Sequence, residues 1–107
     1  MRNSEKYNIQ SFINEAKEME FPALFIHCQK ELNFLDNIKF TAKSPLKDLE
    51  WEIKNYREFI HQFAYILHSG SRPASMEKSD FLRTKPIFEN LVEKNQWKSE
   101  GLSIYDI

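Results

Sequence analysis

An apolar residue recurs every three or four positions between residues 46 and 67, without a break. This spacing places the apolar side chains in one stripe along a helix, and it continues over three heptads. Ser44 and Pro45 are typical of a helix start, and Gly70 suits the left-handed residue that ends a helix. We therefore predict a long helix over 45–69 that packs against other helices, because such a helix is marginal alone in water. The stripe consists of Leu46, Leu49, Ile53, Tyr56, Ile60, Phe63 and Leu67.

A shorter amphipathic helix is predicted over residues 4–20. Ile9, Phe12 and Ile13 repeat with helical spacing, which gives this segment one apolar face. Ser4 and Asn8 are both suitable N-cap residues. A proline at position 22 disfavours helical geometry at the residue before it, so the helix should end near residue 20.

Residues 22–35 have two interpretations. Cys28, Leu32 and Leu35, together with Phe25, share one helical face, and Pro22 suits the first turn of a helix. The run "ALFIHC" also has the composition of a buried strand, with "NIKFTA" as its partner. The length of the segment and its "QKEL" composition favour the helix. A small hairpin in 23–42, which would make the fold α+β, is the alternative.

The last third of the chain is less regular. Residues 71–84 are a polar connection, longer than most links between helices, with a turn of helix near 76–83. Pro86 either opens a further helix over 86–96 or kinks a single helix that runs from Ser79. Beyond it we expect an apolar tail, which contains Leu102, Ile104 and Tyr105, to pack on the core.

Composition supports an all-α fold. The 107 residues include only two glycines and four prolines, too few for the many tight turns of a β fold. Aromatic residues make up 14% of the chain, so the core should be rich in aromatic side chains. We predict a single helical domain over 1–107, a compact bundle of about four helices around the long central helix 45–69.

The charge and the hydropathy of the sequence restrict the classes of partner and the cellular location that we expect. The formal net charge is −1, so the chain has no general attraction to nucleic acid. No apolar run approaches the roughly 20 residues of a membrane span, and the polar N-terminus has no signal-peptide core. A single cysteine permits no internal disulfide. We expect a cytoplasmic protein that does not bind a membrane.

No pattern in the sequence predicts catalysis or metal binding. His61 and His68 are seven residues apart, about 10 Å along a helix, which is too far to chelate one ion. Cys28 lies among apolar residues, where a cysteine usually acts as a small buried hydrophobe rather than a nucleophile. We therefore expect no enzymatic activity, no catalytic residue, no metal and no cofactor.

The outer face of the long helix is the most unusual surface. With Leu46 as heptad position a, Trp51 and Tyr65 fall at position f, opposite the apolar stripe. Phe59 and Ile66 fall beside them at position g. Trp and Tyr are enriched at protein interfaces, so these four residues are our predicted interface with a protein partner or a second copy of the chain. The alternative is that the chain's own helices cover them.

A second, weaker hypothesis is a local basic surface that contacts an anion or nucleic acid. The basic residues concerned are Lys47, Lys54, Arg72, Lys78, Arg83 and Lys85. Acidic residues lie between them, which weakens this hypothesis. The function predicted from the sequence is a small non-enzymatic helical protein, such as an adaptor, an inhibitor or an immunity-type regulator, that acts through a protein surface.

Overall fold

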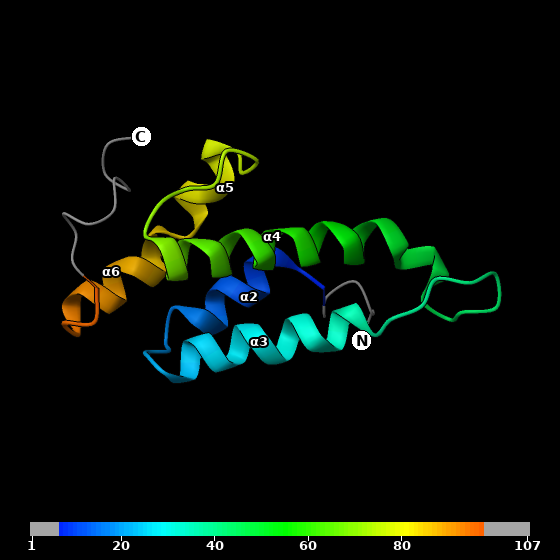
Figure 1. The fold of residues 1–107 in the computed structure, drawn as a ribbon, viewed down its shortest axis with the longest axis horizontal. Helices are drawn as coiled ribbons and strands as arrows, with labels where there is room; N and C mark the ends of the chain where they lie inside the picture. Colours follow the sequence, from blue (N-terminus) through cyan, green and yellow to red (C-terminus); the bar gives the residue numbers. More distant parts are fainter. Residues whose placement is uncertain (1–6, 98–107) are drawn as a thin grey trace.

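The computed structural model describes residues 7–97, and all regular structure among them is helical. The elements are α2 (Ile9–Ala16), α3 (Ala23–Asp36), the short 3-10 helix η1 (Lys47–Leu49), α4 (Glu50–Ser69), α5 (Lys78–Arg83) and α6 (Lys85–Glu93). Figure 1 shows α4 as the long central helix, with α3 antiparallel beside it. Helix α2 lies behind this pair, and α5 and α6 lie at the C-terminal end of α4. The predicted all-α bundle is confirmed.

Helix α4 begins later than the predicted residue 45. The Ser44 side chain accepts a hydrogen bond from the backbone N–H of Leu46 (3.2 Å), and its carbonyl accepts one from Lys47 (3.2 Å). These bonds close a tight turn, and the next residues form η1 before the α-helix starts at Glu50. Ser44 therefore caps a turn rather than the α-helix, because its carbonyl bond spans three residues instead of four.

The end of α4 and its apolar stripe agree with the prediction. Gly70 is left-handed (φ 79°), and its N–H donates to the Ile66 carbonyl at 2.8 Å. The stripe is buried from Ile53 to Leu67, whereas Leu46 and Leu49, which precede the α-helix, are only partly buried.

Helix α2 is shorter than the predicted span 4–20. Its N-cap is Asn8, whose side chain accepts a hydrogen bond from the Ser11 N–H at 3.0 Å. The N–H groups of Glu18 and Met19 then bond to carbonyls only three residues back, so the helix ends at Ala16 in a tighter turn. The other N-cap, Ser4, lies outside the described residues.

Residues 23–36 form helix α3, so the hairpin in 23–42 is wrong. No strand occurs anywhere between residues 7 and 97. Leu24, Cys28, Leu32 and Leu35 are buried on one face of α3, which packs against α4. The stripe of α4 needs a long partner helix, and α3 supplies it, since two short strands would cover less of that stripe.

The connection 71–84 contains α5, and Met76 and Phe81 anchor it in the core with at most 2% exposure. Pro86 lies in the first turn of α6, as predicted. Helix α6 ends at Glu93 rather than residue 96, because Asn95 is left-handed (φ 60°). The Gln96 N–H bonds to the Leu91 carbonyl at 2.7 Å, which completes a Schellman closure of the helix. The apolar tail with Leu102, Ile104 and Tyr105 lies outside the described residues.

Aromatic rings form the centre of the core. Phe12 of α2 contacts the rings of Tyr56, Phe59 and Phe63 on α4 edge to face, with centroids 5.7–6.4 Å apart. Phe63 then meets Phe88 of α6 at 5.7 Å. Edge-to-face pairs of this kind add directional preference to hydrophobic burial. The aromatic composition is therefore what joins α2, α4 and α6.

A side-chain clamp joins the α2–α3 corner to the end of α6. The Gln96 Oε1 accepts from the Phe21 N–H at 2.6 Å, and its Nε2 donates to the Phe21 carbonyl at 3.2 Å. Asn90 adds a bond from Nδ2 to the Met19 carbonyl at 2.9 Å. These side chains satisfy backbone groups that the corner leaves without helical partners.

Candidate functional site

Phe59 and Ile66, predicted as interface residues, lie in the core instead. Their exposed fractions are 2% and 0%. Helix α2 covers this side of α4, since the Phe12 ring packs on Phe59 at 6.2 Å. Heptad position g is buried because α4 has neighbours on more than one flank, so these two residues do not belong to the exposed surface.

Trp51 and Tyr65 do lie on the surface, but in different places. Trp51 is 76% exposed and Tyr65 is 50% exposed. They are fourteen residues apart on α4, about 21 Å at 1.5 Å per residue. Each lines its own hollow, and the two hollows share no residue of the described range 7–97. The predicted single aromatic face is therefore two separate surfaces.

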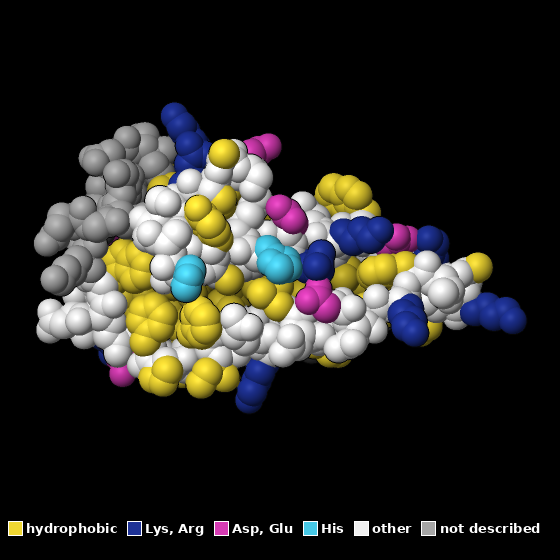
Figure 2. Space-filling model, viewed as in Figure 1, with side chains coloured by type: hydrophobic (Ala, Val, Ile, Leu, Met, Phe, Trp, Pro, Cys, Tyr) yellow, Lys and Arg dark blue, Asp and Glu magenta, His cyan; other side chains and the backbone are white. Residues whose placement is uncertain are grey.

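The first surface is an open groove of about 570 Å³ between α3 and α4, which we call the α3–α4 groove. Its apolar lining includes Phe25 and Leu32 from α3 and Ala64 and Tyr65 from α4. The polar lining residues are Gln29, Asn33, Asp36, His61 and His68. Figure 2 shows hydrophobic side chains gathered on the face where these helices meet, with histidines among them.

The residues at the edges of the α3–α4 groove determine its polarity and charge. At one end Arg57 of α4 donates from Nε to the Asp36 carboxylate of α3 at 2.5 Å, so these two charges offset each other. Ile26, 48% exposed, precedes the groove residue Gln29 by three positions and so lies beside it on α3. The groove therefore offers apolar surface with a polar rim and little uncompensated charge.

Sequence reasoning missed most of this groove. Phe25 was assigned to the core face of α3, yet it is only partly buried. The position of Phe25 around the helix axis distinguishes it from the fully buried residues. It lies about 80° around the helix from Leu35, at the edge of the buried face. The helical spacing of His61 and His68 places both on one side of the long helix, and both line the groove.

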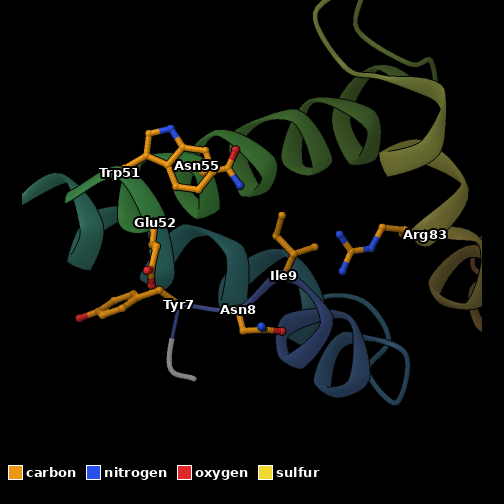
Figure 3. A pocket seen from close by; sticks show the side chains of 7 residues that line it. All are labelled: Tyr7, Asn8, Ile9, Trp51, Glu52, Asn55 and Arg83. Carbon is orange, nitrogen blue, oxygen red and sulfur yellow. The ribbon is translucent and has the colours of Figure 1, made fainter. Parts of the chain in front are cut away.

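The second surface begins as a hollow of about 340 Å³ between the start of α2, α4 and α5. Figure 3 shows Ile9 between Trp51 on one side and Arg83 on the other, with the guanidinium directed toward Ile9. Glu52 projects from α4 toward Tyr7 in the same view. Burial and the nearby Glu31 carboxylate raise the pKa of the Tyr7 phenol.

A further hollow of about 320 Å³ continues along α4 and shares Ile9 and Asn55 with the first. We call the two together the acidic trough. Among residues 7–97, its charged lining consists of the carboxylates of Glu52, Glu58, Glu77 and Asp80 and the guanidinium of Arg83. The α3–α4 groove and the acidic trough therefore lie on different flanks of the same helix.

The predicted basic residues do not form one surface. Lys47 and Lys54 both bind the Glu50 carboxylate at 2.6 Å, and these bonds hold the pKa of Glu50 below its usual range. Lys78 and Arg83 belong to α5 and Lys85 to α6, and Arg83 lines a hollow that contains neither Lys47 nor Lys54.

Arg72 of the loop donates to the Met76 carbonyl at 2.5 Å, so it holds the loop backbone. Arg83 lies 3.8 Å from the Asp80 carboxylate, which offsets its charge. The six basic residues therefore do not gather into the single cluster that the anion-binding hypothesis requires.

Cys28 is fully buried, and burial together with the nearby Glu31 carboxylate raises its pKa to about 12. A thiol in this state holds its proton at neutral pH and is a poor nucleophile. His27 stacks on Phe12 at 5.5 Å, and its Nε2 lies 3.8 Å from the Glu15 carboxylate. His27 therefore packs against α2, whereas Cys28 lies on the buried face of α3.

Within residues 7–97, no three side chains of the types His, Cys, Asp or Glu gather in a way that would hold a metal ion. Among the same residues, no helix has the length and apolar character needed to span a bilayer.

Comparison with protein-family models, with curated proteins and with solved structures returned no match to this chain.

Proposed function

We propose that this chain is a small, non-enzymatic interaction protein, and that the α3–α4 groove is the surface through which it binds a partner protein. The single observation that carries the proposal is this open, largely apolar groove of about 570 Å³ between the two longest helices. Large apolar hollows with a polar rim are typical of protein-binding surfaces.

The occupant that fits the groove is an amphipathic helix of the partner. The groove runs along two antiparallel helices, so a third helix laid on them completes the same ridge-and-groove packing that forms the core. Phe25, Leu32 and Tyr65 would receive its apolar side chains. The amides and histidines of the rim supply hydrogen-bond donors and acceptors for its polar flanks.

Affinity capture with the purified chain tests this proposal. Tyr65→Asp places a charge in the groove, and Leu82→Asp is the matched control, because Leu82 is 47% exposed on α5, outside the groove. A partner retained by the wild type and by Leu82→Asp, but at least tenfold less by Tyr65→Asp, supports the proposal.

Native mass by light scattering distinguishes the other occupant. A dimer that Tyr65→Asp dissociates would identify a second copy of the chain as the occupant of the groove. Identical captured proteins for all three variants, together with a monomeric mass, would overturn the proposal.

A further inference from the structure

We propose that the acidic trough is a second binding surface, and that it takes an extended, positively charged segment of a protein partner, with a Lys or Arg side chain held against the Trp51 indole. This surface is separate from the α3–α4 groove, so the two proposals stand or fall independently.

The charge of the trough is the first argument. Among residues 7–97, four carboxylates line it and Arg83 is the single cationic lining residue, and Arg83 lies 3.8 Å from the Asp80 carboxylate. The side-chain carboxylates of Glu52 and Glu77 form no hydrogen bond or ion pair with any other residue in 7–97, so their charges are not offset locally. A cationic segment complements this surface, while a phosphate backbone would meet one guanidinium and several repelling carboxylates.

Trp51 is the second argument, and it is independent of the charge. Its side chain is 76% exposed at the edge of a hollow, although tryptophan is among the most favourable residues to bury. The face of an indole attracts Lys ammonium and Arg guanidinium groups. Glu52, the next residue, brings a carboxylate into the same hollow.

The length of the trough sets how many residues of an extended partner segment it can hold. From Trp51 to Gln62 it follows eleven residues of α4, about 16 Å at the helical rise. An extended chain covers that distance in about five residues. The amides of Asn8, Asn55 and Gln62 line the trough and can bond to the backbone of such a segment. The carboxylates spread along the trough suit basic side chains at alternating positions.

Calorimetry with a decapeptide of alternating lysine and glycine, in about 50 mM salt, tests the proposal, since low salt preserves charge attraction. We expect binding to the wild type, no binding of the matched glutamate–glycine peptide, and a loss of about tenfold in Trp51→Ala. The Glu52→Gln/Glu77→Gln double variant should also bind more weakly. In a Trp97→Phe background, Trp51 is the only tryptophan, and its emission should change on binding.

Two control variants leave the trough intact. Glu50→Gln removes a carboxylate of α4 that is already bonded to two lysines, and Tyr65→Ala removes the aromatic side chain of the α3–α4 groove. Both should bind the lysine peptide as the wild type does. Equal binding by wild type and Trp51→Ala, or equal loss in Glu50→Gln and in the trough variants, would overturn the proposal.

The chain's own Arg2 and Lys6 precede the trough residue Tyr7 in the sequence. Peptide binding that is absent in the wild type but present in Arg2→Gln/Lys6→Gln would show that these residues compete for the trough. That outcome would overturn the assignment of the trough to a partner.

Discussion

The two flanks of α4 differ in how their charges are arranged. Along the α3–α4 groove, the Asp36 carboxylate that lines it is paired with Arg57. Along the acidic trough, Glu52 and Glu77 have no such partner among residues 7–97. A flank whose charges are paired within the chain offers mainly apolar contact, whereas a flank with unpaired carboxylates also offers long-range attraction. One helix can therefore serve two kinds of partner surface.

The largest expected effect is on the free energy of unfolding, when a buried residue and an exposed residue of α4 are each replaced by alanine. Phe59→Ala removes a buried ring that lines the trough and should lower the free energy of unfolding by about 3–5 kcal/mol. Tyr65→Ala, half exposed in the groove, should lower it by less than about 1 kcal/mol. Guanidinium chloride denaturation measures both. Similar losses in the two variants would mean that Tyr65 is a structural residue and not a free surface.

The reactivity of the Cys28 thiol tests whether solvent can reach the core through the α3–α4 groove. Cys28 lies one turn before the groove residue Leu32 on α3, and its pKa is raised to about 12. At pH 8 only about one thiol in ten thousand is then ionised, against roughly one in four for a free cysteine. Labelling with a thiol reagent should be about three orders of magnitude slower in the folded protein than in denaturant. Rapid labelling of the folded protein would show that the groove opens to the core.

The affinity of the acidic trough for its ligand should depend on salt about tenfold, whereas the affinity of the α3–α4 groove should not. Raising the salt from about 50 mM to about 500 mM shortens the screening length, so binding of the lysine peptide to the trough should weaken by at least about tenfold. Binding at the groove should change less than about twofold, because its charges are paired within the chain. Isothermal titrations at several salt concentrations give both values, and equal slopes would remove the distinction between the flanks.

The smallest expected effect concerns Glu50 at the start of α4. Its carboxyl should titrate below the ordinary glutamate value of about 4.3, because Lys47 and Lys54 bond to the ionised form. A pKa that is lower in the folded than in the unfolded state stabilises the fold above the unfolded value, and this contribution is lost as the pH falls through the folded value. Carbon-13 NMR of the carboxyl measures the shift. Lys47→Met/Lys54→Met should move the pKa upward, and an unchanged value would show that the pairing does not persist in solution.

Local rules predicted much of the fold. The stripe from Ile53 to Leu67 and the closure at Gly70 follow from spacing and from the left-handed preference of glycine, both of which are visible in the sequence. The short span of α2 and the early end of α6 were not predicted. They depend on contacts between distant segments, such as the bonds of Gln96 to Phe21, and on the left-handed conformation of Asn95.

The candidate surfaces were predicted only in part. Sequence spacing identified Trp51 and Tyr65 as aromatic residues away from the stripe, and both are exposed. The same spacing put Phe59 and Ile66 with them, because heptad positions do not show on how many flanks a helix is covered. The acidic trough joins α4 to Glu77 and Asp80, which follow a loop after that helix, so periodicity along one helix could not reveal it.

The clamp made by Gln96 also bears on how the chain is made on the ribosome. Phe21 emerges from the exit tunnel long before Gln96, which follows it by 75 positions. The antiparallel pair of α3 and α4 can assemble as soon as residue 70 is outside, since its contacts are shorter in range. The corner between α2 and α3 must await nearly all of the described chain, so its backbone groups stay bonded to water or to a chaperone until synthesis is almost finished.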